Sequence, residues 1–566
     1  MGAYPSQPPL PHSISSAAEA AFASRVFAEG EVGASEPERR IGRVIAVSAS
    51  QIAVLLDQPV CGLNGIGALE IGALLKVYTR VSTAYGMVTG LRLPLPGLEP
   101  SDQDLKIAEL ELAGEIMFES ERAQGLFERG VSAYPALDEA VYLAGPADLA
   151  LVYARPNAAT AAIGTIYQDI AVPAYILTDE LFGKHFSIVG TTGSGKSCVV
   201  VAILRAVIAA NPHAHVMLLD PHGEYASAIG DMAAVLSPLA GLYLPYWLFN
   251  FEEIVEIVIG PDAHPEQAKI LGEAILSAKQ SFFAKSGLDA HGTVDTPAPY
   301  PMSDVLRFLD AAMGSLNRPE NVAVYQSLRN RIVALQTDPR YDFVFGGRFR
   351  LRDELPDILS RLFRIPVQNK PITILDVSGI PSEVLNVVVS VLCRLAFDFA
   401  LWSESPIPIT IVCEEAHRYA PRDRGLGFEP AKRALSRIAK EGRKYGVSLC
   451  VVTQRPSDLA PGLLSECNTL FALRMTNQDD QDIVRGAVPE ASHGLMNFLP
   501  ALRNGEAIVV GEGVSLPMRI ALAYLPEARR PKSATASFSK AWRRDPDASA
   551  VARTVERWRR GIRDAP

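Results

Sequence analysis

The spacing of apolar residues changes character several times along the chain. From "IGRVIAVSASQIAVLLD" to about residue 165, short β-branched runs alternate with polar residues and are separated by Gly and Pro. This pattern is typical of a small β-barrel or sandwich, so we predict one of these two β folds over residues 36–165. The preceding residues 1–35 are rich in Ala, Ser, Pro and Glu with weak periodicity, and we expect a flexible N-terminal segment there.

A strand, a Gly-rich turn, a helix and a second strand follow one another in "FSIVGTTGSGKS", "CVVVAILRAVIAAN" and "HVMLLDPHGEY". The same α/β alternation resumes later with "PITILDVSG", "PITIVCEEAH", "VSLCVVTQRP" and "TLFALRM". Continuous apolar runs separated by helices indicate a parallel sheet covered on both faces. We therefore predict an α/β fold whose core consists of residues 166–254 and 361–525.

Two further segments have helical periodicity without strands. Residues 255–360 contain "PEQAKILGEAILSAKQSFF", "MSDVLRFLDAAM" and "NVAVYQSLRNRIVALQ", which predicts a helical insertion into the core. Residues 526–566 form a basic C-terminal segment with one apolar helical stripe. Its members are Val551, Val555, Trp558 and Ile562.

Composition limits the class of protein. The chain has 566 residues, 48% of them apolar, and a formal net charge of −9, so it can bury more than one core. The acidic balance argues against a protein that coats nucleic acid over its whole surface, but it permits a localised basic channel. Six cysteines lack C-x-x-C spacing and indicate buried thiols in a reducing compartment. With no evident secretory signal, and with the long apolar runs interrupted by charged residues, we expect a cytoplasmic protein without a membrane partner.

The stretch "IVGTTGSGKS" matches the G-x-x-x-x-G-K-[ST] phosphate-binding pattern between an apolar strand and a helix. Glycines let backbone N–H groups turn toward phosphates, Lys196 adds a point charge, and Ser197 can ligate Mg²⁺. The alternative, a glycine turn with a chance Lys-Ser pair, does not explain this context. The predicted ATP-binding residues are Gly190, Thr192, Gly193, Ser194, Gly195, Lys196, Ser197 and Cys198.

Hydrolysis also needs an acid near the magnesium and a base for water, usually at the end of a buried strand. Three strands compete for this role: one ends at Asp220 with Glu224 nearby, one at Asp376, and one at the pair Glu414 and Glu415. Because the last supplies two adjacent carboxylates, we assign Glu414 to the magnesium shell and Glu415 as general base. The pair acting as a partner of a helix N-terminus is the alternative.

Other polar residues follow these strands. Gln454 in "VVTQRPS" can contact the γ-phosphate or the attacking water, or it can be a turn residue before Pro456. Arg443 ends a predicted helix before Gly446 and suits a charge delivered to a neighbouring subunit's phosphate. The loop "HRYAPRDRGLGF" either grips DNA phosphates or is an ordinary surface loop. Its arginines are Arg418, Arg422 and Arg424.

Taken together, "IVGTTGSGKS", "LLDPHGEY", "ITIVCEEAHRYAP", "EGRKYG" and "VVTQRPS" closely resemble the HerA family of hexameric DNA translocases, which are relatives of FtsK. The resemblance covers most of the chain and implies a RecA-like P-loop ATPase core after an N-terminal barrel, with a C-terminal brace over residues 526–566. It also implies ATP and Mg²⁺ as ligands, Glu414 and Glu415 as the acid pair, and Arg443 as a trans-acting arginine finger.

The resemblance further implies a homo-hexamer with double-stranded DNA in a central pore, and a nuclease or other effector subunit docked on the β-barrel face. It favours an ATP-dependent DNA translocase or helicase that serves DNA end processing or antiphage defence. A nucleotide-dependent hexameric scaffold that activates an effector with little translocation is the alternative. A conjugation-type motor at a membrane is disfavoured by the interrupted apolar runs.

Overall fold

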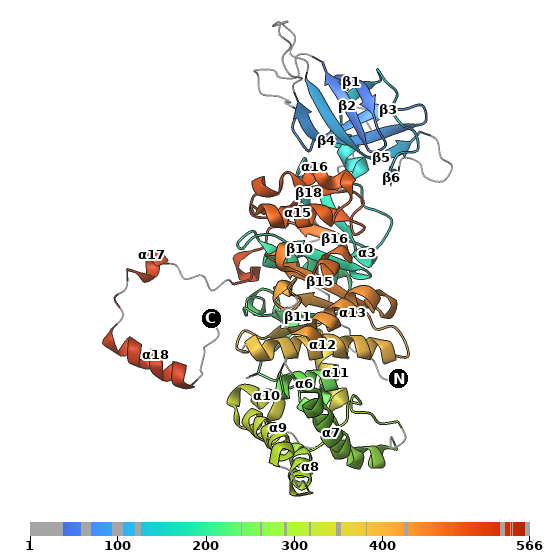
Figure 1. Ribbon diagram of the computed structural model, residues 1–566. Coiled ribbons are helices and arrows are strands. Elements are labelled where there is room, and N and C mark those ends of the chain that lie inside the picture. The colour runs from blue at the N-terminus through green and yellow to red at the C-terminus, as the bar shows by residue number, and fades with distance from the viewer. Residues whose placement is uncertain are drawn as a thin grey trace, which may run out of the picture.

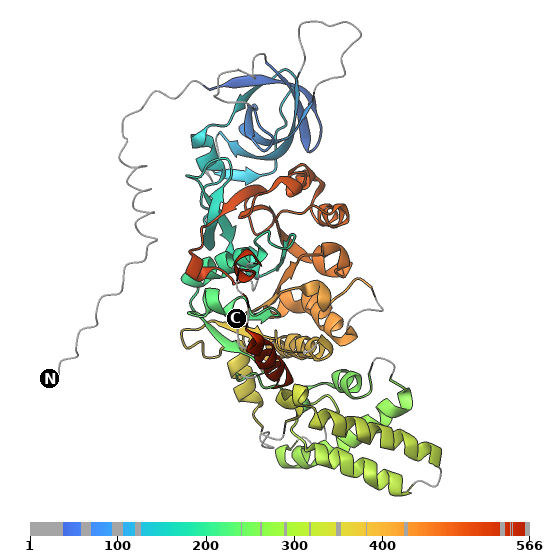
Figure 2. The same ribbon diagram turned by 90° about the vertical axis from the view of Figure 1, so that its left-hand side faces the viewer.

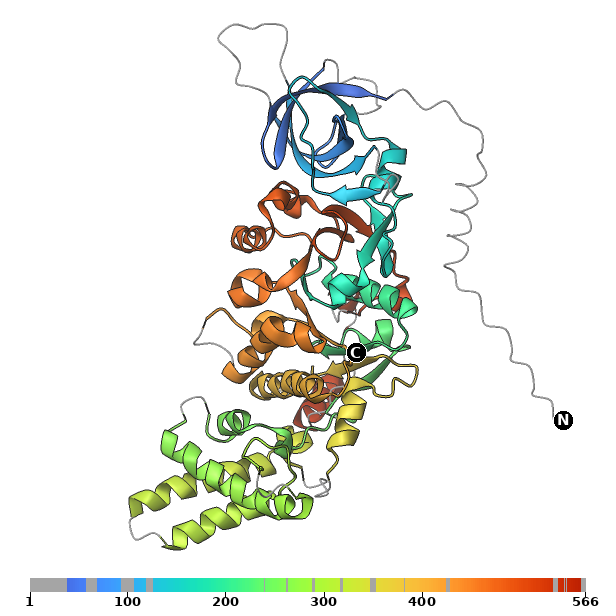
Figure 3. The same ribbon diagram turned by 90° about the vertical axis from the view of Figure 1, so that its right-hand side faces the viewer.

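The computed structural model arranges the chain along one long axis, with a barrel at one end, a large sheet in the middle and a helical group at the other end (Figures 1, 2 and 3). The structure describes residues 38–57, 69–92, 106–118, 126–238, 240–260, 263–287, 291–315, 319–346, 353–380, 382–423, 428–532, 538–543, 545 and 547–560. The expected flexible segment at residues 1–35, together with Cys61, Arg424 and Ile562, lies outside these ranges.

Seven antiparallel strands form the N-terminal barrel in the order β2-β1-β7-β3-β4-β5-β6, and pairing of β2 with β5 closes it. Their alternating side chains place one face inside, where Val44, Val54, Val88 and Leu110 are fully buried. The strands are β1 (Arg40–Val47), β2 (Gln51–Leu56), β3 (Leu74–Tyr78), β4 (Ser82–Arg92), β5 (Ile107–Met117), β6 (Phe127–Arg129) and β7 (Ala140–Leu143).

The central sheet has eleven strands in the order β12-β13-β11-β14-β15-β10-β16-β17-β18-β8-β9. The seven from β12 to β16 are parallel, as predicted, and the rest continue antiparallel. The parallel strands are β10 (His185–Val189), β11 (His215–Asp220), β12 (Ala233–Leu236), β13 (Ile372–Asp376), β14 (Ile409–Cys413), β15 (Val447–Thr453) and β16 (Cys467–Ala472). The antiparallel strands are β8 (Thr160–Ile166), β9 (Pro173–Leu177), β17 (Glu506–Gly511) and β18 (Met518–Leu522).

The boundary predicted at residue 165 is wrong for β8. This strand pairs with β18 of the central sheet, where Ile166 lies opposite Ile520, so the barrel strands end at Leu143. The reason is that β8 is a short antiparallel strand with a mixture of buried, half-buried and exposed residues, as the barrel strand β2 is. Periodicity alone cannot distinguish the two sheets.

Helices cover both faces of the central sheet. They are α2 (Pro146–Val152), α3 (Thr178–Phe182), α4 (Lys196–Ala210), α5 (Ala226–Ile229), α12 (Ser382–Trp402), α13 (Glu429–Tyr445), α14 (Pro461–Ser465), α15 (Gln478–Gly486) and α16 (His493–Met496). Among the described residues, a single helix, α12, is both long enough and apolar enough to cross a membrane. The stretch concerned is Val384–Trp402, and 72% of it is buried inside the protein. It lies beside α13 (Figure 1) and serves as a core helix.

The predicted insertion is helical and packs as a separate group beyond α12 (Figures 2 and 3). The group extends slightly beyond the predicted bounds 255–360 at both ends, because its first and last helices cross them. Its helices are α6 (Phe251–Val258), α7 (Pro265–Ser286), α8 (Met302–Ser315), α9 (Pro319–Thr337), α10 (Asp342–Phe345) and α11 (Leu355–Phe363). A buried ion pair ties it to the core, since Arg394 Nη2 of α12 lies 3.0 Å from Glu253 Oε2 of α6. The Glu253 side chain is only 1% exposed.

The C-terminal helices α17 (Phe538–Ala541) and α18 (Ala548–Arg560) stand away from the body of the molecule (Figure 1). On α18, Val551 is 69% exposed and Trp558 is 81% exposed. These two members of the predicted apolar stripe are therefore exposed in the single chain, and a third, Ile562, lies outside the described residues.

Arg394→Met should destabilise the protein by about 3–5 kcal/mol, because it leaves the buried Glu253 carboxylate without its charged partner. Thermal unfolding followed by calorimetry measures the loss. Adding Glu253→Gln should recover part of it, and Arg307→Met, which breaks an exposed pair with Asp304, should cost less than about 1 kcal/mol. Equal losses for Arg394→Met and Arg307→Met would contradict this account.

Candidate active site

The phosphate-binding loop joins β10 to α4 at residues 190–195. Gly190, Gly193 and Gly195 have φ values of 157°, 76° and 106°, a region that residues with side chains rarely adopt. A Cβ at Gly190 would also lie 2.8 Å from Leu473 Cβ. The glycines thus allow a turn that aims backbone N–H groups and the start of the 15-residue helix α4 at one point, the geometry of an anion site.

Lys196 lies over this loop with its side chain nearly buried. Its Nζ donates to the carbonyl oxygens of Gly190 at 3.0 Å and Thr191 at 3.2 Å. Burial lowers the pKa of Lys196, while the charges of Glu414 and Glu415 oppose that shift. The amine is therefore positioned where phosphate oxygens would replace carbonyl oxygens as its partners.

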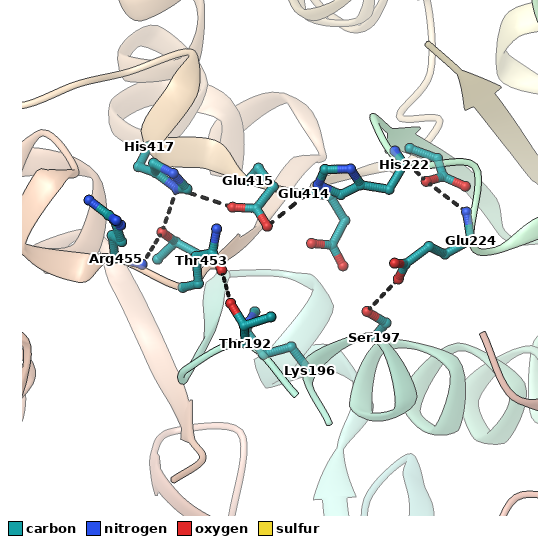
Figure 4. Close-up of polar contacts among 12 residues, drawn as sticks. Thr192, Lys196, Ser197, His222, Glu224, Glu414, Glu415, His417, Thr453 and Arg455 are labelled. Atoms are coloured by element: carbon teal, nitrogen blue, oxygen red, sulfur yellow. Dashed lines mark hydrogen bonds and ion pairs between the residues drawn. The ribbon is translucent and has the colours of Figure 1, made fainter. Parts of the chain in front are cut away.

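The two predicted acids follow β14, which pairs with β11 on one side and β15 on the other. Glu414 is 5% exposed and Glu415 is 7% exposed. The Tyr225 hydroxyl donates to Glu414 Oε1, and burial raises the pKa of Glu414 to about 7. Glu415 has a left-handed backbone with φ 52°, which turns its side chain along a different direction (Figure 4).

Two histidines flank the Glu415 carboxylate. His222 Nε2 lies 3.7 Å from Oε1 and His417 Nδ1 lies 3.4 Å from Oε2. Burial alone would raise the pKa of Glu415, but His222, His417 and Lys196 together lower it. Glu415 is therefore ionised at neutral pH, as a general base requires.

The competing acids have other positions. The Asp220 carboxylate accepts hydrogen bonds from four successive backbone N–H groups, so it shapes the "PHGEY" loop instead of facing the nucleotide. These donors belong to His222, Gly223, Glu224 and Tyr225. Asp376 accepts from Ser378 at the end of the next strand.

The predicted magnesium ligands Ser197 and Glu414 lie at the same edge of the sheet (Figure 4). Glu224, treated above as a competitor, accepts from Ser197 Oγ at 3.4 Å. Among the described residues no group of three His, Cys, Asp or Glu side chains could hold a metal by itself. One hydroxyl and one or two carboxylates nevertheless fit Mg²⁺, because this ion takes its remaining ligands from water and substrate phosphates.

Gln454 follows β15 and reaches the phosphate loop, where the Thr192 hydroxyl donates to its Oε1. Lys196, Ser197, Glu414 and Glu415 lie at one edge of the sheet (Figure 4), and the contact with Thr192 places Gln454 at the same edge. Sequence reasoning missed His222, Tyr225, His417 and Thr453. The motifs "DPHGEY" and "EEAH" contain the first three, but nothing in their spacing shows that they meet.

Arg443 does not reach this site in its own chain. It is exposed in the last turn of α13, immediately before β15, whereas Gln454 follows the far end of that strand. The seven residues of β15 span about 20 Å at ~3.3 Å per residue. Lys184 lies before β10, at the same edge as Arg443, and pairs with Glu180 and Glu512.

Arg418 and Arg422 are exposed on the loop that follows Glu415. Arg424 lies outside the described residues. Both of these described arginines lie beside the site. Their contact with DNA stays a prediction.

The comparisons with known proteins agree with the resemblance drawn from the motifs. The family model of the central domain of the helicase HerA matches residues 161–396. The chain is 27% identical over 437 residues to the DNA double-strand break repair helicase HerA of Pyrococcus furiosus, covering 69% of this chain and 74% of that protein. It is also 27% identical over 397 residues to the probable HerA of Methanocaldococcus jannaschii, covering 65% and 76%.

Two solved structures are similar to the chain at low identity. VirB4 of Thermoanaerobacter pseudethanolicus has a TM-score of 0.46 and 15% identity, covering 66% of this chain and 99% of that one. The plasmid coupling protein TrwB, in complex with a non-hydrolysable ATP analogue, has a TM-score of 0.45 and 16% identity, covering 69% and 94%. At these scores the likeness carries no argument about function.

Asp220→Asn should lower the ATP turnover number by on the order of tenfold or more, because the amide keeps one acceptor oxygen but loses the charge and the second oxygen, which weakens the positioning of the His222 and Glu224 backbone. It should also destabilise the fold by about 1–3 kcal/mol, since buried N–H groups lose a charged partner. Steady-state ATPase assays and thermal unfolding measure both effects. Asp376→Asn, at the same edge, is the matched control and should keep most of the turnover; equal defects in the two variants would contradict the special role of Asp220.

Proposed function

Because residues 161–396 match the family model of the HerA central domain, and HerA proteins at 27% identity cover 69% and 65% of the chain, we propose that it is an ATP-driven translocase of double-stranded DNA. The observation that carries this proposal is the convergence of Lys196, Glu415 and Gln454 at the phosphate-binding loop. These residues supply charge, a base and a polar contact to phosphate, the three elements of nucleotide hydrolysis.

The chain's own residues perform the chemistry as follows. The loop N–H groups and Lys196 bind the β- and γ-phosphates, and Ser197 with Glu414 would hold Mg²⁺, which neutralises developing charge when bound. Glu415 accepts a proton from the attacking water, and Gln454 orients that water or the γ-phosphate. Burial of both carboxylates keeps competing bulk water away from the site.

The position of Arg443 supports a ring in which each ATP lies between two subunits. This arginine is exposed at the opposite strand edge from its own phosphate loop, so it can act on a neighbour's nucleotide. We propose a homo-hexamer with DNA in its pore, acting in the cytoplasm. The exposed stripe of α18 is proposed as a brace on an adjoining subunit.

An effector-activating scaffold is the second candidate, and the barrel favours it. Tyr78 stacks on Phe118 with ring centroids 6.4 Å apart, and these rings are 37% and 51% exposed. Exposed aromatic clusters mark protein interaction sites, so we propose that a nuclease or other effector docks here, in DNA end processing or antiphage defence. ATPase stimulation by long duplex DNA favours the translocase, whereas stimulation by the effector alone favours the scaffold.

Lys196→Ala should weaken ATP binding severely, because it removes the charge that meets the phosphates. Glu415→Gln should bind ATP but lose at least ~100-fold in turnover number, the range for a general base. Nucleotide-binding titrations and steady-state assays with long duplex DNA separate the two effects. An active Glu415→Gln protein would exclude Glu415 as the base.

Arg443→Ala and Glu415→Gln should each be inactive alone but regain turnover when their subunits are mixed. In mixed rings, some sites combine Glu415 of one subunit with Arg443 of its neighbour, so they are complete. The measurement is ATPase rate against mixing ratio, with Lys196→Ala plus Glu415→Gln as the control pair that cannot complement. No recovered turnover would show that Arg443 does not act in trans.

A further inference from the structure

Three exposed arginines lie on the two loops that follow β14 and β15, next to the active site. We call Arg418, Arg422 and Arg455 the arginine ridge. Within the described ranges neither Arg418 nor Arg422 forms an ion pair, and Arg455 pairs with Asp458 at 3.3 Å, with both side chains more than half exposed. Such an exposed pair is weak, so the ridge offers three cations to a polyanion such as the phosphates of DNA.

The ridge is built from two loops that are fixed to each other. The first follows β14 through the short 3₁₀ helix Ala416–Arg418, and the second follows β15 through Pro456–Asp458. Arg422 N donates to Asp458 O at 2.7 Å, and Ala460 N donates to Ala420 O at 2.9 Å. Because backbone bonds join them, the two loops should move as one unit.

Two side chains connect this unit to the catalytic carboxylate (Figure 4). Thr453 Oγ1, fully buried at the end of β15, accepts from the Arg455 backbone N at 3.1 Å. His417 Nδ1 lies 3.0 Å from the same Oγ1 and 3.4 Å from Glu415 Oε2. A continuous path therefore runs from Arg455 through Thr453 and His417 to Glu415.

The tautomer of His417 follows from its neighbours. Glu415 Oε2 is buried and has no hydrogen bond with good geometry. A lone pair on Nδ1 would repel this carboxylate oxygen, whereas an Nδ1–H is attracted by both Oε2 and Thr453 Oγ1. His417 is thus a donor poised between Thr453 and Glu415, so a small shift of Thr453 changes how it holds the carboxylate.

A second connection runs through the backbone. Glu415 begins the 3₁₀ helix that carries Arg418, with Arg418 N donating to Glu415 O at 2.8 Å. The left-handed backbone of Glu415 is a conformation that a residue with a side chain holds only when its surroundings impose it. The ridge also acts on His417 through its charge. Burial lowers the pKa of His417, and the charges of Arg418 and Arg455 lower it further, whereas the charges of Glu415 and Asp458 raise it.

We propose that Thr453 and His417 are positioning residues that couple phosphate contact at the arginine ridge to the carboxylate of Glu415, so that DNA binding raises the rate of ATP hydrolysis. The proposal rests on the proposed function, because it takes duplex DNA as the polyanion. Of the three ridge arginines, Arg455 is a DNA contact that the sequence did not suggest.

Thr453→Val tests the coupling in the full-length protein, since it keeps the side-chain shape and removes the hydroxyl. Four quantities are measured: the turnover number without DNA and with saturating long duplex, the KM for ATP, and the Kd for the duplex from a direct binding titration. We expect loss of the stimulation with an unchanged Kd for the duplex. Thr453→Ser, which restores the hydroxyl, should restore the stimulation.

Two comparisons separate coupling from a general loss of structure. Thr410→Val removes another buried hydroxyl of the same sheet, which bonds to Ser448 at 2.8 Å away from the ridge, and should keep the stimulation. His417→Leu should lose the stimulation, whereas His417→Asn, whose amide can donate near the position of Nδ1, should retain part of it.

Three other outcomes would contradict either the coupling or the proposed function. Full stimulation of Thr453→Val would overturn the coupling. So would a defect that saturating DNA repairs, because Thr453 would then shape only the DNA-binding surface. A wild-type protein whose ATPase long duplex DNA does not stimulate would overturn the proposed function itself, and this result is obtained before any variant is made.

Discussion

The parallel pairing of β14 with β11 on one side and β15 on the other is the constraint on which the site depends. Buried backbone groups must be hydrogen-bonded, so this pairing fixes the register, and Leu219, Cys413 and Val451 lie side by side across the three strands. The strands therefore end at one edge. Because β10 pairs with β15, the phosphate-binding loop leaves the sheet at that edge as well.

The two adjacent glutamates acquire different chemistry from this arrangement. Glu414 continues into the protein interior, meets Tyr225, and has its pKa raised by burial to about 7. Glu415 turns through a left-handed backbone toward two histidines, and its pKa is lowered in spite of burial. Two carboxylates with separated pKa values can take separate roles, one near a metal and one toward water.

Several exposed side chains of the described residues lie away from the active site of their own chain. Arg443 is exposed at the edge opposite the phosphate loop, Val551 and Trp558 are exposed on α18, and aromatic side chains are exposed on the barrel. These features are consistent with a chain that acts within an assembly. A net charge of −9 does not conflict with the proposed DNA binding, because the proposed ring would need cations only where it faces the duplex.

The sequence by itself determined the elements and the chemistry whose signals are local. The phosphate loop is a continuous strand, turn and helix around Lys196, and Glu414 and Glu415 directly follow an apolar strand. An N-terminal β domain, the parallel strands and the helical insertion also follow from periodicity, whereas the choice of a barrel over a sandwich came from the resemblance to the HerA family. Only the tertiary structure decided that β8 joins the central sheet and that Thr453 and His417 meet beside Glu415. The reason is that strand order depends on which buried surfaces pack together across the whole chain, and local spacing of apolar residues does not record that choice.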